Sequence, residues 1–190
     1  HVVAALAERT RDPRSARECF ERAGDVYAEC VGDYARAAHC YVRAATLAES
    51  DPAPLEKLAH VLETAARWEE AATAYERLLA RVHDPVQRAW TLVRLGTIKE
   101  TRLRKIEEAF AAFRLAVDAA PTFAPAVQAL LRVARTRKLH GLVIELERRE
   151  AERIADPRAR SVRFTALAEM IEELSPGVDD HLDHLGESSS

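Results

Sequence analysis

The sequence predicts an all-α protein, an array of antiparallel helix pairs, and two observations lead to this prediction. First, the composition favours helices: hydrophobic residues make up 48% of the chain, many of them alanine and leucine, while aromatic residues make up 6%. Sheet-rich folds need more β-branched, aromatic and turn residues than this. Second, the dipeptide Asp12-Pro13 recurs at Asp84-Pro85 and at Asp156-Pro157, 72 residues apart each time (84 − 12 and 156 − 84). A fixed internal period indicates a repeat architecture.

The repeat extends through the whole of each 72-residue unit. Residues 12–83 align with residues 84–155 without a gap, and small residues meet small ones while bulky residues meet bulky ones. The alignment places Gly24 on Gly96, Ala37 on Ala109, Tyr41 on Phe113, Ala44 on Ala116 and Leu58 on Leu130. Each unit holds two helix pairs, because prolines mark a second boundary at Pro52 and Pro54 and at Pro121 and Pro125. One pair cannot bury its own apolar face, so the pairs must stack.

An Asp before a Pro predicts the start of a helix. The Asp side chain accepts hydrogen bonds from free backbone N–H groups, and Pro at the first helical position gives up no needed donor. Asp12, Asp51, Asp84 and Asp156 fit this role. The expected helices lie near residues 1–9, 13–31, 33–49, 53–65, 68–82, 86–102, 105–119, 124–137, 139–154 and 157–174, with a further one at 178–185.

Small and bulky side chains follow one order along these pairs. The first pair carries Ala23, Gly24, Tyr27, Gly32, Tyr34, Ala37, Tyr41 and Ala44, the second Leu58, Ala59, Leu62, Ala66, Trp68, Ala71, Tyr75 and Leu78, and the third Leu95, Gly96, Ile106, Ala109, Phe113, Ala116 and Pro121. This pattern resembles the tetratricopeptide repeat. The resemblance implies a right-handed α-solenoid of about five repeat units, in which small residues let paired helices approach and larger ones fill the gap to the next helix.

Some positions depart from the family pattern. The first and third pairs carry one extra residue between their helices, at 28–31 and 101–104, so their turns should differ from the others. In the fourth pair Val143 and Glu147 stand where a small residue and an aromatic one are expected, and in the last pair His181 takes the small position. We therefore expect the solenoid at 12–174, and a capping helix with a disordered tail at 175–190. Residues 1–11 correspond to the second helix of a truncated preceding repeat, as in a piece of a longer solenoid.

Composition excludes several classes of partner and setting. A net charge of −3 with 31% charged residues gives no basic surface for phosphate backbones, so we expect no nucleic acid partner. No apolar run approaches the roughly 20 residues that cross a bilayer, so we expect no membrane partner. Cys19, Cys30 and Cys40 are odd in number and lack CxxC spacing, which favours a reducing cytoplasm over a disulfide framework. Arginine outnumbers lysine by 24 to 4, which is typical of proteins from GC-rich bacteria.

The sequence lacks the common catalytic and cofactor-binding motifs. It contains no GxGxxG, P-loop, HExxH or GxSxG pattern, so we expect neither an enzyme nor a cofactor. Adjacent carboxylates such as those at 69–70 do not share a helix face and are typical of solvated surface, and the cysteines at 19 and 40 are expected as core fillers rather than nucleophiles. One alternative is a metal site formed by Asp180, His181 and His184. A polar capping helix explains the same three residues without a metal.

In the family that the chain resembles, the first helix of each pair lines an inner groove that binds peptides. The corresponding residues are Glu18, Glu21, Asp25, Glu29, Glu56, His60, Glu63, Trp90, Val93, Thr97, Glu100, Gln128, Arg132 and Arg135. The N-terminal half of this set is acidic and its middle is apolar. The resemblance thus implies a non-catalytic scaffold for a protein or peptide, basic and with an apolar anchor near Trp90.

Three other interpretations of these features stay open. The acidic helix faces could be plain solvated surface. The array could instead be a self-assembling module that forms a homo-oligomer, or a metal-binding protein.

Some members of the family bind the acidic C-terminal tail of chaperones with Lys, Asn and Arg on this face. This chain has Glu21, Asp25, Glu56 and His60 in those places, so we predict that it does not bind such a tail.

Overall fold

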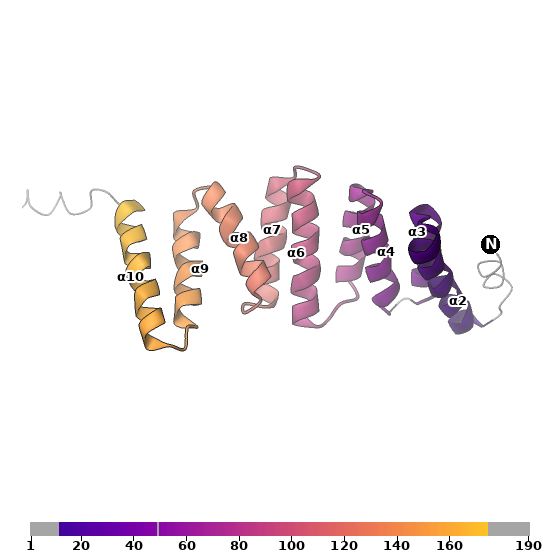
Figure 1. The fold of residues 1–190 in the computed structure, drawn as a ribbon, viewed down its shortest axis with the longest axis horizontal. Coiled ribbons are helices and arrows are strands. Elements are labelled where there is room, and N and C mark those ends of the chain that lie inside the picture. Colours follow the sequence, from indigo (N-terminus) through magenta and orange to yellow (C-terminus); the bar gives the residue numbers. More distant parts are fainter. Residues whose placement is uncertain (1–11, 49, 175–190) are drawn as a thin grey trace, which may run out of the picture. The chain divides into compact units, whose positions relative to one another are not determined.

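The computed structural model describes residues 12–48 and 50–174, and every regular element within them is a helix (Figure 1). The helices are α2 (Pro13–Asp25), the π-helix η1 (Val26–Val31), α3 (Tyr34–Leu47), α4 (Ala53–Thr64), α5 (Trp68–Leu79), α6 (Pro85–Thr101), α7 (Ile106–Ala119), α8 (Ala124–Thr136), α9 (His140–Glu152) and α10 (Pro157–Leu174). The prediction of an all-α chain is confirmed over this part. The helices expected at 1–9 and 178–185 lie outside the described residues.

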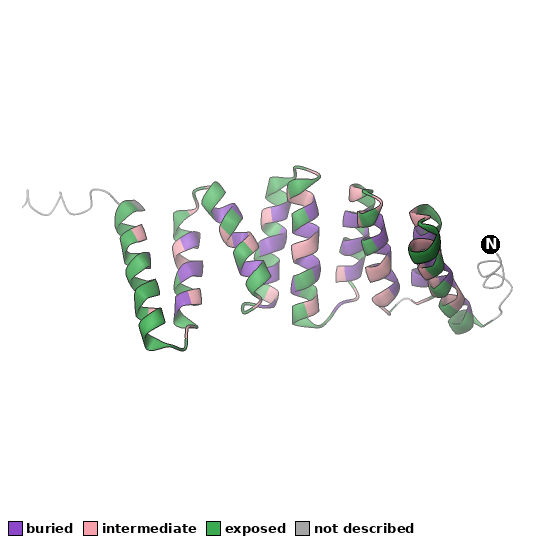
Figure 2. Cartoon of the chain, in the orientation of Figure 1, coloured by how far each residue is buried: buried purple, intermediate pink, exposed green. Residues whose placement is uncertain are grey.

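The chain divides into two compact units, His1–Ala129 and Leu130–Ser190. Within the first unit each helix packs against the next one along the chain, from α2 and α3 through to α6 and α7. Within the second unit α9 packs against α10. Buried residues form stripes along these helices, while the outward sides are exposed (Figure 2). No helix in the described ranges is both long and apolar enough to span a membrane.

All four Asp-Pro dipeptides stand at the start of a helix, as predicted; at Asp51-Pro52 the Asp51 carboxylate accepts from the backbone N–H of Ala53 at 3.0 Å. The Asp12 carboxylate accepts from the backbone N–H groups of Arg14 and Ser15, at 3.3 and 3.0 Å. Asp84 accepts from the N–H of Gln87 at 2.7 Å. Asp156 does the same for the N–H groups of residues 158 and 159, at 3.2 and 3.3 Å. Each carboxylate satisfies donors that the first helical turn leaves free.

The turns inside the pairs alternate between two geometries. In the second and fourth pairs the N–H of Arg67 donates to Leu62 and that of Leu139 to the carbonyl of residue 134, both at 2.9 Å. In the first and third pairs the bond spans one residue more, from Asp33 to Tyr27 and from residue 105 to residue 99. The longer turn was expected from the extra residue in those two pairs. Positive φ values recur with the repeat as well, at 32 and 104 and at 66 and 138.

In the first and third pairs a glycine on the first helix packs directly against an aromatic ring on the second. A Cβ atom built on Gly24 would lie 2.5 Å from Cε1 of Tyr41, and one on Gly96 would lie 2.5 Å from Cε1 of Phe113. These two pairs occupy the same positions of the 72-residue repeat. The alanines one turn from each ring, at 37, 44, 109 and 116, are fully buried. The ring therefore rests directly on the backbone of the paired helix.

We predict that Gly96→Ala lowers the free energy of unfolding by about 1–3 kcal/mol, because the added methyl group overpacks the contact with Phe113. Gly141→Ala is the matched control, since a Cβ there meets nothing within 4 Å. In that helix alanine should be neutral or stabilising by up to about 1 kcal/mol. Urea unfolding followed by circular dichroism measures both changes. Equal midpoints for Gly96→Ala and the wild type would contradict the packing described here.

Candidate partner-binding groove

The residues expected to line the groove are spread over the first helices of the pairs. They lie on α2 (Glu18, Glu21, Asp25), η1 (Glu29), α4 (Glu56, His60, Glu63), α6 (Trp90, Val93, Thr97, Glu100) and α8 (Gln128, Arg132, Arg135). None of these side chains is buried. Arg132 and Arg135 belong to the second compact unit, and all the others belong to the first. The candidate residues on α2, α4 and α6 thus all lie within the first unit.

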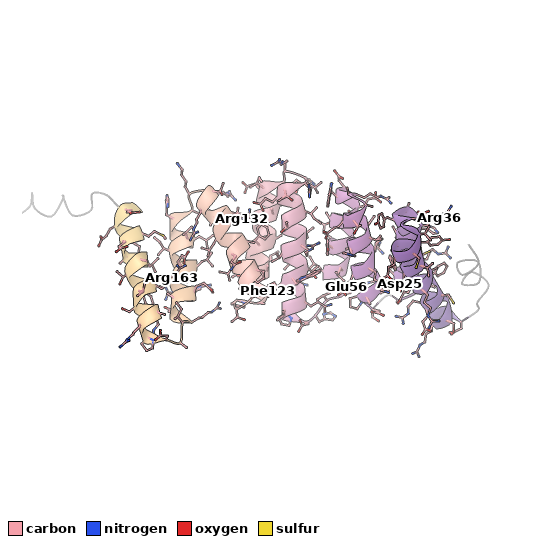
Figure 3. All side chains as sticks on the ribbon, viewed as in Figure 1. Asp25, Arg36, Glu56, Phe123, Arg132 and Arg163 are labelled. Carbon is pink, nitrogen blue, oxygen red and sulfur yellow. The ribbon has the colours of Figure 1, made fainter. Side chains whose placement is uncertain are left out.

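Asp25, labelled in Figure 3, forms a bridge between three helices. Its carboxylate on α2 accepts a hydrogen bond of 2.8 Å from the hydroxyl of Tyr41 on α3. It also accepts from Nζ of Lys57 on α4, at 2.7 and 2.9 Å. The acid thus ties the first helix of one pair to its own partner helix and to the first helix of the next pair.

Glu63 repeats this bridge one pair later. Its carboxylate on α4 accepts from the hydroxyl of Tyr75 on α5 and forms an ion pair with Arg94 on α6. Glu56, about two turns earlier on the same helix, accepts from the side-chain amide of Gln87 on α6. These acids stand in the predicted groove, yet each already has a partner from a neighbouring helix. The groove is therefore less negative than a count of its acids indicates.

The second unit contains a variant of the bridge. Glu147 on α9 occupies the position where the repeat pattern has an aromatic residue, and its side chain is only 4% exposed. One carboxylate oxygen pairs with Arg135 on α8, and the other accepts from Arg163 on α10 at 2.5 Å. A buried carboxylate held by two guanidinium groups replaces the tyrosine hydroxyl as the polar link between helices.

Tyr41 and Tyr75 are held in their protonated form. Burial raises the pKa of each phenol above its ordinary value, and the hydrogen bond to Asp25 or Glu63 raises it further. Ionising either phenol would place a second negative charge against the carboxylate in a poorly solvated site. Both hydroxyls consequently act as donors over the neutral pH range.

A hollow of about 360 Å³ lies beside the first bridge. Its lining comes from α2, η1, α3 and α4 and consists of Asp25, Ala28, Glu29, Tyr34, Tyr41, Lys57, His60, Val61 and Thr64. Two aromatic rings and aliphatic groups provide apolar walls, while Glu29 adds an exposed carboxylate at the rim. This combination suits a side chain with an apolar stem and a polar or cationic tip.

Trp90 is the large aromatic residue of the groove, and its side chain is held in place. It remains 45% exposed on α6. Its ring meets that of Tyr75 edge to face, with centroids 6.4 Å apart, and the guanidinium carbon of Arg94 lies 5.7 Å from its ring centroid. Because Tyr75 on α5 and Arg94 on its own helix restrain the ring, it can present apolar area to a ligand with little loss of conformational entropy.

The other sequence-derived candidates give no site in the described ranges. His39 is exposed whereas Cys40 is buried, so the two do not form a nucleophile pair. Cys40 fills the core as expected, and burial raises the pKa of its thiol; Cys19 is only partly buried. No group of three or more His, Cys, Asp or Glu residues there could hold a metal ion. The candidates Asp180, His181 and His184 lie outside those ranges.

Sequence reasoning did not identify the partners of the groove acids. Tyr41, Lys57, Tyr75 and Arg94 were assigned to the core or left unassigned, although together they define the bridges. A signal was available in the sequence: an acid on one first helix, a tyrosine on the following helix and a cation on the next first helix.

Comparison with solved structures identifies the fold. The second TPR domain of the human RPAP3 protein, solved by NMR in complex with the HSP70 peptide SGPTIEEVD, is 21% identical with a TM-score of 0.53, over 64% of this chain and 98% of that one. A crystal structure of MamA is 16% identical with a TM-score of 0.53, over 83% and 79% of the two chains. Another crystal structure of MamA is 14% identical with a TM-score of 0.54, over 88% of this chain and 93% of that one.

No protein-family model and no curated protein sequence matches the chain. At such low identities the structural likeness concerns the fold alone. The chain has the tetratricopeptide-like helical repeat fold, as the residue pattern predicted.

We predict a steep loss of stability above about pH 10, the ordinary pKa of tyrosine. Because the folded state raises the pKa of Tyr41 and Tyr75, the unfolded chain releases these protons first as the pH rises. The free energy of unfolding should therefore fall by roughly 1.4 kcal/mol per pH unit for each tyrosine above that pH, and be unaffected below it.

In the double variant Tyr41→Phe/Tyr75→Phe the free energy of unfolding should no longer show this additional fall with pH. The control Tyr27→Phe should still show it. Urea unfolding between about pH 8 and 11.5 measures all three proteins. If the free energy of unfolding of the double variant fell with pH as steeply as that of the wild type, the two phenols would not link folding to pH.

Proposed function

We propose that this chain is a non-catalytic scaffold that binds a segment of a partner protein along the face formed by α2, α4 and α6. The observation that carries the proposal is Trp90, an exposed aromatic ring held by Tyr75 and Arg94 in the middle of that face. Fixed aromatic side chains commonly supply most of the energy of a protein interface. The RPAP3 domain of the same fold was solved with a peptide bound, which supports a peptide or protein as ligand.

The partner segment is basic and carries an apolar anchor. The anchor packs on Trp90, while a lysine or arginine of the segment enters the hollow beside Asp25 and Glu29. Because Lys57 already neutralises Asp25, the attraction depends mainly on Glu29 and on the overall negative potential. The free cysteines support a cytoplasmic setting for this complex.

An acidic chaperone tail does not fit this face. The peptide SGPTIEEVD carries three carboxylate side chains and a terminal carboxylate. Glu21, Asp25 and Glu56 offer these groups no positive charge, and the nearby cation Lys57 is already engaged by Asp25. The ordinary expectation for a tetratricopeptide groove that binds chaperones therefore does not apply here.

We predict that Trp90→Ala weakens binding of a basic peptide by about 2 kcal/mol or more, close to thirtyfold. The peptide is selected by display on the wild-type chain, and its binding is measured by calorimetry. Glu29→Lys should weaken binding more at low salt than at high salt. Leu115→Ala is the control, because it truncates a comparably exposed apolar residue on α7, outside this face.

The chaperone peptide SGPTIEEVD should bind no tighter than millimolar in the same assay. Tight binding of that peptide, or a selected ligand whose affinity ignores both groove substitutions, would refute the proposed groove.

Self-association is a second candidate function, and α10 favours it. By the 72-residue offset Phe164 corresponds to Leu92 and Phe20, which are buried, whereas Phe164 is 37% exposed. Ala168 corresponds to the two glycines that receive aromatic rings, and it too is exposed. With Ile171, these residues form an open apolar stripe at helical spacing that could pack against another copy.

If α10 mediates self-association, the wild-type mass should rise with concentration and Phe164→Glu should remain monomeric. Size-exclusion chromatography with light scattering at several concentrations measures this. Val162→Glu is the matched control, because it adds the same charge on α10 outside the stripe. A wild-type chain that stays monomeric at all concentrations would remove this candidate.

A further inference from the structure

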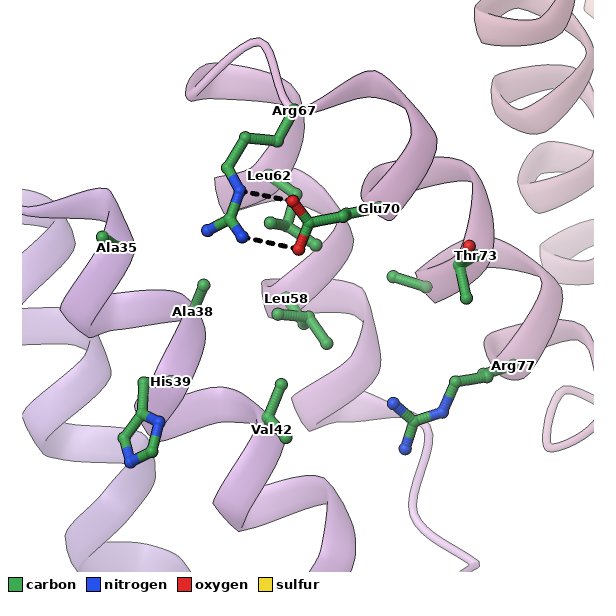
Figure 4. Close-up of a pocket in the computed structure, with 11 residues that line it drawn as sticks. Ala35, Ala38, His39, Val42, Leu58, Leu62, Arg67, Glu70, Thr73 and Arg77 are labelled. Carbon is green, nitrogen blue, oxygen red and sulfur yellow. Dashed lines mark hydrogen bonds and ion pairs between the residues drawn. The ribbon is translucent and has the colours of Figure 1, made fainter.

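A second hollow lies between α3 and α5, over α4, and it shares no residue with the groove described above. It has a volume of about 420 Å³ (Figure 4). Its lining consists of Ala35, Ala38, His39 and Val42 from α3, Leu58 and Leu62 from α4, Arg67 before α5, and Glu70, Thr73, Ala74 and Arg77 from α5. The volume falls in the range of specific ligand sites.

The floor of this hollow is apolar and its rim is charged. Ala38, Leu58, Leu62 and Ala74 are almost fully buried and form the floor. At one end Arg67 and Glu70 close the rim with two parallel hydrogen bonds, from Nε to Oε1 at 2.7 Å and from Nη2 to Oε2 at 2.5 Å. These two charges cancel each other.

Arg77 lies at the other end of the hollow, toward Val42 (Figure 4). It forms no ion pair with any residue of the described ranges, and the exposed His39 lines the opposite, α3 side of the hollow. The rim is therefore neutral at the Arg67 end and positive at the Arg77 end. An apolar ligand with a negative group at one end matches both features.

At some of the corresponding positions the second 72-residue unit has larger apolar residues. Ala38 corresponds to Phe110 and Glu70 to Leu142. The hollow in the first unit thus depends on small and polar residues where the repeat elsewhere has bulky ones. It is a particular property of α3 and α5 rather than a necessary result of the repeat.

The shape of the hollow favours a helix as its occupant. Ala35, Ala38 and Val42 lie on α3 at the spacing i, i+3, i+7, and Glu70, Ala74 and Arg77 lie on α5 at i, i+4, i+7. Two such rows border a groove about two helical turns long, which is close to 10 Å along the helix axis. The small residues allow the apolar side chains of a helix to reach the floor.

We propose that this groove binds an amphipathic helix of a partner protein, with about two turns of apolar side chains on the Ala38 floor and an Asp or Glu against Arg77. This ligand is acidic, whereas the one proposed for the groove at Trp90 is basic. The two sites would allow one chain to hold two different partners.

A designed helical peptide with a fluorescent label tests the proposal. It carries Leu at i, i+3 and i+7 and Glu in the turn that meets Arg77, and a matched peptide has Lys in place of Glu. Fluorescence anisotropy should show binding of the Glu peptide to the whole chain and at least roughly tenfold weaker binding of the Lys peptide. Trp90→Ala should leave this affinity unchanged, which separates the inference from the proposed function.

Two variants of the chain test the location. Ala38→Phe introduces the residue of the second unit and should abolish binding by filling the hollow. Arg77→Glu changes only the exposed rim, and it should reverse the preference between the two peptides. Thermal unfolding verifies that both variants remain folded, and Arg77→Glu decides the question if Ala38→Phe does not fold.

Absence of binding at millimolar peptide, or equal binding by the wild type and Arg77→Glu, would overturn the proposal. So would a wild-type oligomer that excludes the peptide and dissociates on Arg77→Glu, because the occupant would then be a second copy of the chain.

Discussion

The contact of an aromatic ring with a glycine backbone sets the spacing of the helix pairs, and the other features of the first unit depend on it. Tyr41 on Gly24 and Phe113 on Gly96 bring the two helices of a pair together, so the flanking alanines become fully buried. Only with this spacing does the Tyr41 hydroxyl reach the carboxylate of Asp25 on the opposite helix. In the first pair, core packing and the polar bridge at Asp25 are therefore consequences of the same approach.

The bridges give the groove acids two roles. Asp25 and Glu63 hold adjacent pairs together through Lys57 and Arg94, and the same acids contribute to the surface on which a ligand would lie. A basic ligand must compete with Lys57 for Asp25, so the bridge limits how strongly that acid can attract a partner. At the corresponding positions of the third pair stand Thr97, Phe113 and Ala129, which cannot form an ion bridge. The polar link of that pair is instead Lys99 on α6, which forms ion pairs with Glu76 on α5 and with Glu108 on α7.

The parts of the fold that depend on local sequence were predictable. An Asp-Pro dipeptide caps a helix by contacts with its own next residues, and a glycine facing an aromatic position appears in each unit, so both follow from spacing. The partners of the groove acids were not predicted, because each belongs to a helix 12 to 32 residues away and charge alone does not select among the available cations. The hollow at Ala38 was missed for a different reason: it depends on side chains that are smaller than those of the equivalent positions.

Helix α4 separates the two hollows and contributes to both. Lys57, His60, Val61 and Thr64 recur at helical spacing and face the hollow beside Asp25, whereas Leu58 and Leu62 face the one beside Ala38. Because 3.6 residues make one turn, neighbouring residues of one short helix point to different surfaces. The cationic Lys57 and the apolar Leu58 and Leu62 can thus lie on one short helix and still face different hollows. A substitution in the floor at Leu58 or Leu62 changes one surface and leaves the polar contacts of the other intact, so opposite ligand chemistries can coexist on a single repeat.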